Sequence, residues 1–126
     1  MNAFLLVALG GGLGASARYG LGLWVGRVVG HGFPYGTLAA NVLGSLAMGV
    51  LVGLLARYTP GWQNEARLFG AVGVLGGFTT FSSFSLDAIT LIERGQWGAF
   101  AIYVLVSVMA SLLALIVGLY LMRGVA

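Results

Sequence analysis

The chain has 126 residues, of which 60% are hydrophobic and only 7% are charged, and its formal net charge is +3. An average soluble domain carries about 25% charged residues, so this composition excludes a water-soluble globule. The six basic residues are all arginines and are scattered singly along the chain, which argues against a nucleic-acid-binding surface, because such surfaces cluster their basic side chains.

Long apolar stretches predict an all-α membrane protein with four transmembrane helices, because about 20 apolar residues cross a bilayer as a helix. The expected spans are residues 3–24, 35–56, 68–92 and 97–122, and together they form one transmembrane domain over residues 1–126. We expect a loop over Arg27–Pro34. A second loop is expected over Arg57–Arg67, which contains Pro60 and Gly61.

The arginines in the connections are almost evenly divided between the two sides of the membrane. With four crossings, Arg57, Arg67 and Arg123 fall on the side of the N-terminus, and Arg27 and Arg94 fall on the other, joined by Arg18 if it reaches its own end of the first span. The excess of Lys and Arg in short loops sets the direction of insertion. We therefore expect insertion in both orientations; the alternative is a weak bias set by Arg67 or by lipid.

Glycine is unusually frequent inside the spans, with 22 residues in the whole chain. Several glycines recur four apart, as in Gly10 with Gly14, Gly22 with Gly26, Gly49 with Gly53, and Gly73 with Gly77. Small residues at this spacing allow helix backbones to approach closely in lipid. Close helix packing is the expected role of most of them.

The third span contains the sequence Gly76-Gly77-Phe78-Thr79-Thr80, in which two glycines precede a β-branched pair. Both residue types weaken a helix, so we expect the third helix to be broken near Gly76–Thr80. Broken backbone is tolerated at membrane depth only against protein or a watery cavity, and its exposed carbonyls are ligands for Na⁺. Asp87 and Glu93 are expected to mark the exit of this span.

Two polar side chains in the first two spans each have two interpretations. Arg18 would attract anions in a vestibule, or it would snorkel toward the interface as a structural residue. Asn41 would offer its amide donors to an anion, or it would hold a neighbouring helix. Position and spacing leave both pairs of alternatives open.

The last two spans carry aromatic and hydroxyl side chains at helical spacing. Phe78, Phe81 and Phe84 recur every three residues; such a stripe usually serves packing, but the electropositive edges of the rings can also accompany an anion. Tyr103, Ser107 and Ser111 are four apart and stack on one helix face. This line of hydroxyls would bind a permeating anion or bond to another helix.

Three blocks of residues, taken in this order in a four-span chain, resemble the Fluc/CrcB family of fluoride channels over essentially the whole chain. The blocks are Gly11-Gly12-Leu13-Gly14-Ala15 with Arg18-Tyr19, Gly36-Thr37-Leu38 with Asn41 and Gly44, and Gly76-Gly77-Phe78-Thr79-Thr80-Phe81-Ser82-Ser83-Phe84. The third block is the most specific. The resemblance implies an antiparallel, dual-topology homodimer with two fluoride pathways and a central Na⁺ where the two broken helices cross.

The resemblance also implies roles for individual residues. Asn41 would be the pore-facing amide, Phe81 and Phe84 the aromatic pair along the anion path, and Arg18 the vestibule arginine. Gly76 and Thr79 would give backbone carbonyls to the sodium ion. Ser83, where many relatives have threonine, keeps a hydroxyl in the fluoride pathway, and the polar track would consist of Tyr103, Ser107 and Ser111.

The function implied by the family is passive export of fluoride across the cytoplasmic membrane, in a multi-pass protein of that membrane, which relieves fluoride toxicity. A proton-coupled small multidrug exporter is the nearest alternative, but it needs a membrane-embedded carboxylate, and we expect Glu65, Asp87 and Glu93 to lie in loops or at span ends. A non-transporting assembly subunit is a further alternative. An enzyme is not expected, because His31 is the single histidine and no catalytic cluster is evident.

Overall fold

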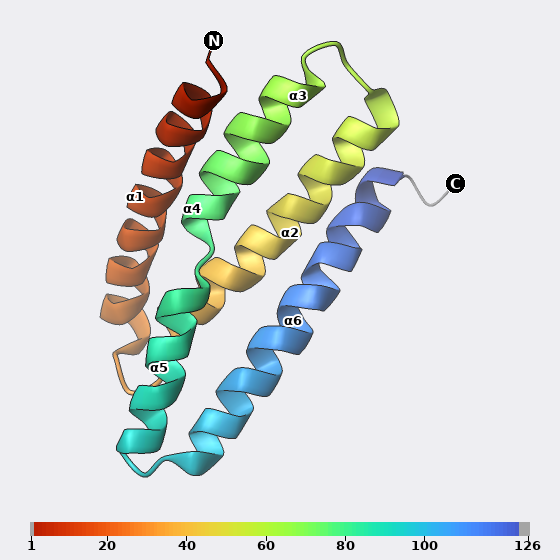
Figure 1. Cartoon of the computed structure of the whole chain (residues 1–126). Helices are drawn as coiled ribbons and strands as arrows, with labels where there is room; N and C mark the ends of the chain where they lie inside the picture. The colour runs from red at the N-terminus through yellow and green to blue at the C-terminus, as the bar shows by residue number, and fades with distance from the viewer. Residues whose placement is uncertain (1, 124–126) are drawn as a thin grey trace.

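The computed structural model describes residues 2–123, and all regular structure in that range is helical (Figure 1). The elements are α1 (Ala3–Val29), α2 (Tyr35–Tyr58), α3 (Gln63–Ala66), the π-helix η1 (Arg67–Leu75), α4 (Gly76–Phe78), α5 (Phe81–Glu93) and α6 (Trp97–Arg123). They form four spans that are long and apolar enough to cross a membrane: α1, α2, the segment Gln63–Glu93, and α6. The predicted four-helix membrane fold is confirmed.

The third span is broken, as predicted, but at the threonine pair and not at the glycines. Gly76 and Gly77 remain helical in α4, whereas Thr79 and Thr80 are extended, with ψ of 156° and 124°. Before the break, the backbone N–H of Gly76 donates to the carbonyl of Ala71, five residues earlier, as expected for a π-helix. The third span therefore consists of two helical segments joined by two extended residues.

Two helix ends lie further along the chain than the sequence suggested. Helix α1 continues to Val29, with Arg27 in its last turn, where a cation is favoured by the helix dipole. It ends where Gly30 adopts a φ of 81°, a conformation that glycine adopts at little cost. Helix α2 runs through Arg57 to Tyr58, and helix resumes at Gln63. The loops are thus residues 30–34 and 59–62, shorter than predicted.

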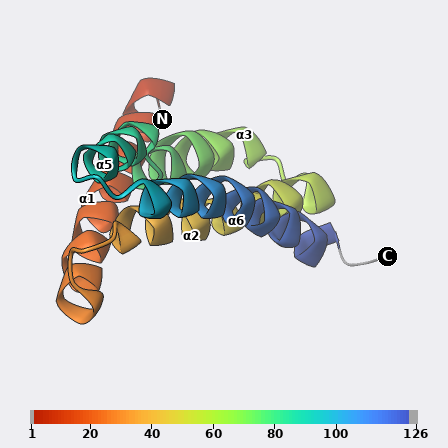
Figure 2. The same cartoon turned by 90° about the horizontal axis from the view of Figure 1, so that it is seen from below.

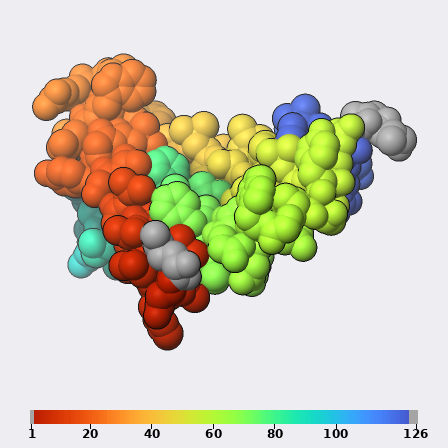
Figure 3. All heavy atoms as spheres, turned by 90° about the horizontal axis from the view of Figure 1, so that it is seen from above, coloured from red at the N-terminus to blue at the C-terminus, as the bar shows by residue number. Residues whose placement is uncertain are grey.

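The first half of the third span packs against α1 backbone to backbone. A Cβ atom on Gly14 would overlap the carbonyl of Val74, and one on Gly77 would lie 2.5 Å from the carbonyl oxygen of Gly11. Gly10 and Gly73 meet in the same seam. Figure 3 shows α1 (red to orange) lying against the green third span. The predicted close packing of these glycines is confirmed, and a side chain has no space there.

Helices α2 and α6 form the second close pair. A Cβ atom on Gly49 would overlap the carbonyl of Leu115, and one on Gly118 would lie 2.5 Å from the carbonyl oxygen of Leu46. Figure 2 shows α6 lying along α2, while α1 runs in a different direction. Two tightly packed units, α1 with the first half of the third span and α2 with α6, also contact each other directly, where Gly36 meets Gly22 and where Leu51 meets Gly70.

Exposed aromatic side chains mark the two ends of the bundle. Tyr58 and Trp62 are 63% and 64% exposed at the end that holds the α2–α3 loop, the upper end in Figure 1. Trp24 and Trp97 are 62% and 61% exposed toward the other end, which carries the loops at residues 30–34 and 94–96. Tyr and Trp gather at membrane–water interfaces, so these two belts place the headgroup levels of the bilayer.

Candidate functional site

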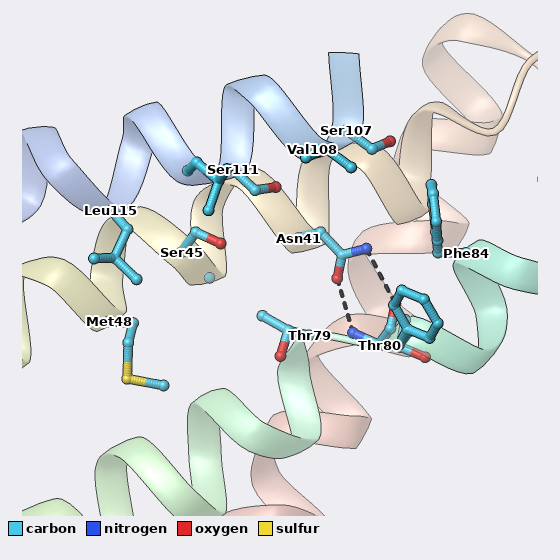
Figure 4. Close-up of a pocket in the computed structure, with 13 residues that line it drawn as sticks. Asn41, Ser45, Met48, Thr79, Thr80, Phe84, Ser107, Val108, Ser111 and Leu115 are labelled. Atoms are coloured by element: carbon cyan, nitrogen blue, oxygen red, sulfur yellow. Dashed lines mark hydrogen bonds between the residues drawn. The ribbon is translucent and has the colours of Figure 1, made fainter. Parts of the chain in front are cut away.

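A groove of about 370 Å³ lies where the break in the third span faces α2 and α6 (Figure 4). Its lining consists of uncharged residues from α2, the break, α5 and α6. They are Asn41, Gly44, Ser45, Met48, Thr79, Thr80, Phe81, Phe84, Ser107, Val108, Ser111, Leu112 and Leu115. Polar groups in this groove are therefore amides and hydroxyls only.

Asn41 bridges α2 to the break through both ends of its amide. The backbone N–H of Thr80 donates to Asn41 Oδ1 at 2.8 Å, and Asn41 Nδ2 donates to the carbonyl oxygen of Thr80 at 3.1 Å (Figure 4). The side-chain amide thus pairs with the extended backbone as a neighbouring peptide group would. One of the two Nδ2 hydrogens remains free to donate into the groove. Both interpretations of Asn41, helix clamp and anion donor, are compatible with this position.

The break diverts the hydrogen bonds that a continuous helix would give to Gly76 and Thr79. The amide of Thr80, which would donate to the Gly76 carbonyl, donates to Asn41 instead. The amide of Ser83, which would donate to the Thr79 carbonyl, donates to Thr80 Oγ1 at 3.1 Å and so caps α5. These are the two carbonyls predicted as sodium ligands. Carbonyl oxygens that lack a helical hydrogen bond are suitable ligands for a hard cation such as Na⁺.

The close approach of the break to α2 depends on Gly44. A Cβ atom there would overlap Thr79 Cγ2 and lie 3.2 Å from Phe78 Cδ2. The Thr79 hydroxyl itself donates to the carbonyl of Leu75 at 2.9 Å, and its methyl group occupies the space that Gly44 leaves. Without a side chain at Gly44, the break lies close enough to α2 for Asn41 to form hydrogen bonds with Thr80.

Three aromatic rings continue from the groove toward the loop at residues 94–96. The ring centroids of Phe81 and Phe84 are 5.6 Å apart with the planes tilted by 46°, and those of Phe84 and Tyr103 are 5.1 Å apart with a tilt of 39°. Phe81 is 79% exposed, whereas Tyr103 is fully buried. The predicted Phe81 and Phe84 pair thus lines the groove, with one ring uncovered.

The predicted hydroxyl line on α6 is divided between two environments. Ser107 and Ser111 line the groove (Figure 4), and Ser107 Oγ is buried without a hydrogen-bond partner among the described residues. Tyr103 lies beyond Phe84, and its hydroxyl donates to Asp87 Oδ2 at 3.2 Å. A buried hydroxyl without a partner is uncommon in proteins, so Ser107 is a candidate ligand for a group that the groove would hold.

Three other predicted site residues, Arg18, Gly76 and Ser83, lie outside the groove lining. Arg18 is half-buried, and its Nε donates to the carbonyl of Gly77 at 3.2 Å. It also lines a separate pocket of about 360 Å³ between α1 and α2, with Tyr19 and Thr37. The half-buried Ser83 is not part of the groove lining, and its backbone amide takes part in the α5 cap.

Asp87 lies inside α5, before its end at Glu93, but at the level of the loop at residues 30–34, with which it lines a pocket of about 270 Å³. It is half-buried and hydrogen-bonded to Tyr103. The hydroxyl of Tyr103, 16 positions away along the chain, provides the partner that a carboxylate in this place requires.

Ser45 and Thr80 both line the groove, although neither was predicted as a site residue. Ser45 follows Asn41 by four residues on α2 and therefore lies on the same helix face, a signal that was available. Thr80 was part of the predicted break, but nothing in its local sequence shows that its peptide groups bond to Asn41.

Comparisons with known proteins agree with the resemblance. Residues 5–119 match the model of the family described as "CrcB-like protein, Camphor Resistance (CrcB)". A relative in Hyphomonas neptunium named "Fluoride-specific ion channel FluC" is 51% identical over 125 residues, covering 99% of this chain and 98% of that protein. A protein of the same name in Chelativorans sp. is 54% identical over 125 residues, covering 99% of both chains. One in Agrobacterium fabrum is 52% identical over 119 residues and 94% of both.

Proposed function

The chain belongs to the CrcB-like family, and from that premise we propose that it is a fluoride-selective channel through which the anion leaves the cell passively. Relatives at about half identity over nearly the full chain carry the name fluoride-specific ion channel. The observation that carries the proposal is the groove at the break, which combines amide, hydroxyl and ring groups without a charged side chain.

The groove has the chemistry that a small, strongly hydrated anion needs. A selectivity filter replaces the water around an ion with its own polar groups, and here the free hydrogen of Asn41 and the hydroxyls of Ser107 and Ser111 are the donors. The edges of Phe81 and Phe84 add weak positive potential. Conduction also requires that the ion leave, and a groove without a fixed positive charge binds it weakly enough.

The complete pathway in this proposal is formed by two copies of the chain in antiparallel orientation. The groove is open on one side, and Phe81 at its rim is 79% exposed. A second copy would provide the missing wall. The near-equal numbers of arginines on the two sides of the membrane permit insertion in both orientations.

A sodium ion belongs to the same proposal. The carbonyls of Gly76 and Thr79 would hold it, because the break has diverted their helical donors. A bound Na⁺ would supply positive charge beside the break and join the two copies. Exchanging Na⁺ for N-methylglucamine during purification should lower the fluoride efflux that is later measured; unchanged efflux would remove sodium from the proposal.

The proposal is tested with purified protein in fluoride-loaded liposomes, with efflux followed by a fluoride electrode. Wild-type protein should release fluoride and retain chloride in parallel vesicles. Phe81→Ile should reduce efflux because the ring edge is lost, and Asn41→Asp should reduce it because a carboxylate repels the anion. Phe4→Ile is the matched control, since Phe4 is 87% exposed on α1. Vesicles that retain fluoride with wild-type protein would refute the function.

A proton-coupled exporter remains a second candidate because of Asp87, a half-buried carboxylate within α5. Exchange of a substrate for a proton uses such a group. The two candidates differ in what drives transport: the channel releases fluoride with equal pH on both sides, whereas an exporter needs a pH gradient. An Asp87→Asn variant would abolish that dependence in an exporter.

A further inference from the structure

A second pocket of interest lies at the upper end of the bundle, between the last turn of α2 and the first residues of the third span. It has a volume of about 250 Å³ and combines apolar residues of α2 with polar residues of α3 and the first residue of η1. The lining residues are Leu55, Ala56, Gln63, Asn64 and Arg67. The groove of the proposed channel is lined by other residues.

The polar side of this pocket consists of hydrogen-bond donors. Arg67 Nη2 donates to Asn64 Oδ1 at 3.2 Å, which orients the exposed guanidinium toward Asn64 and leaves the Asn64 amide nitrogen free to donate. Gln63 adds a second amide. Glu65, the one acidic residue in this part of the sequence, is exposed and is not part of the lining. A planar guanidinium beside two amides suits the oxygens of a phosphate group.

The two ends of the bundle differ in charge. Among the described residues, the side chains of Arg57, Arg67 and Arg123 outnumber the one acidic side chain, Glu65, at the upper end. The guanidinium of Arg57 donates through Nη1 to the carbonyl of Met122 at 3.1 Å, which holds the ends of α2 and α6 together and brings Arg123 to the same place. Figure 3, which looks onto this end, shows the blue end of α6 beside the yellow-green α2–α3 loop.

At the lower end the positive excess is smaller. Arg27 and Arg94 are matched in number by Asp87 and Glu93, which leaves Arg18, whose Nε donates to the carbonyl of Gly77. The pocket at residues 55–67 therefore lies at the more positive end of the bundle. A positive field attracts anionic lipid headgroups, at about 1 kcal/mol for each basic residue near the surface.

The depth of the pocket matches the level of a lipid phosphate. Tyr58 and Trp62, exposed by 63% and 64%, flank it in the chain and belong to the aromatic belt at the interface. Leu55 lies about one helical turn before Tyr58, on the side of the hydrocarbon. We propose that this pocket binds an anionic phospholipid of the phosphatidylglycerol type, with its phosphate on Arg67, Asn64 and Gln63 and the start of an acyl chain on Leu55 and Ala56.

The arginines also predict a preference among lipids. Phosphatidylethanolamine presents the same phosphate but carries an ammonium group, and the positive field of Arg57, Arg67 and Arg123 repels that group. Phosphatidylglycerol has a net negative charge and no such cation. The pocket is therefore selective for the anionic lipid and not for phospholipid in general.

The test measures lipid binding and does not depend on transport. Delipidated full-length protein is titrated with phosphatidylglycerol or phosphatidylethanolamine, and bound lipid is counted by native mass spectrometry while the unfolding temperature is recorded. Wild-type protein should retain phosphatidylglycerol at one molecule per chain and unfold at a higher temperature with it. Arg67→Gln should weaken this binding about fivefold or more, the factor that corresponds to about 1 kcal/mol.

Arg94→Gln is the matched control, because it removes an exposed arginine from the other end, and it should bind phosphatidylglycerol as wild-type protein does. Gln63→Leu removes a donor without changing charge and should weaken binding less than Arg67→Gln. Equal loss in Arg67→Gln and Arg94→Gln, undiminished binding in Arg67→Gln, or equal retention of phosphatidylethanolamine would each overturn the proposal.

Discussion

The third span meets its neighbours in two opposite ways. Its first half touches α1 through glycines, so that Gly14 and Gly77 leave no space for a side chain in the seam. Around the break, its second half faces α2 and α6 across a groove of about 370 Å³ lined by amide, hydroxyl and ring groups, while further along α5 Ala88 and Leu91 pack with Tyr103 of α6. The interface with α1 holds the first half of the span in place, and the interface with α2 and α6 contains the break and the polar groups of the groove. The division falls at Thr79 and Thr80, where the helix stops.

The largest effect is expected in the seam. Gly14→Ala places a Cβ atom onto the carbonyl of Val74, and neither backbone can move without separating the two helices. We expect a loss of about 3 kcal/mol or more in stability, measured as a lower unfolding temperature and less monodisperse protein in detergent.

Gly12→Ala, two residues away, is the control for the seam. No atom lies within 4 Å of a Cβ atom at that position, so the change should be neutral or stabilise the helix by up to about 1 kcal/mol. Similar unfolding temperatures for the two variants would mean that close contact between α1 and the first half of the third span does not contribute to stability.

The next largest effect is expected where the two regions meet. Asn41→Ala leaves the N–H and the carbonyl of Thr80 without their partner, which should cost about 2–4 kcal/mol. Fluoride efflux should be lost as well. Ser45→Ala, one turn along α2 in the same groove, should unfold close to the wild-type temperature, and a cost equal to that of Asn41→Ala would contradict the role of the amide bridge.

A smaller effect is expected for the cap of α5. Thr80→Ala removes the hydroxyl that accepts from the Ser83 amide and should lower stability by about 1 kcal/mol. Thr80→Ser keeps the hydroxyl and should remain near wild type in chemical denaturation. If both variants lose the same stability, the methyl group and not the cap supports the break.

The smallest change in stability is expected inside the groove, where a substitution should leave stability unchanged or raise it but should lower fluoride efflux. Ser107 Oγ is buried and has no partner among the described residues, so Ser107→Ala should leave stability unchanged or raise it by up to about 1 kcal/mol. Fluoride efflux should fall severalfold because a donor is lost. If Ser107→Ala loses stability but keeps its fluoride efflux, the Ser107 hydroxyl contributes to the packing of α6 and not to transport.

Local patterns predicted the fold well because each span is long and apolar. Uncharged stretches gave four helices, and the run from Gly76 to Thr80 gave the break. The exact break position depended on Asn41, 39 positions earlier in the chain, and no local propensity contains that contact. The helix ends near Arg27 and Arg57 were missed because charge was taken as the end of a helix.

The candidate site was predicted to a similar extent. Asn41, Phe81, Phe84, Ser107 and Ser111 line one groove, as their helical spacing and the family resemblance suggested. The environment of Asp87 was not predictable, because Tyr103, on another helix, is its partner. Contacts between distant segments decide whether a polar residue lies in a pathway, at a clamp or beside a partner, and a single sequence does not record them.

The neutral groove is proposed to carry fluoride as a charged ion without coupling to protons. Proteoliposomes loaded with potassium fluoride, with equal pH inside and outside, separate this from proton-coupled transport when a fluoride electrode records before and after valinomycin is added. Little efflux is expected before valinomycin and rapid efflux afterwards, because potassium then balances the charge that leaves. Efflux that is independent of valinomycin and appears only with a pH gradient would rule out an uncoupled channel.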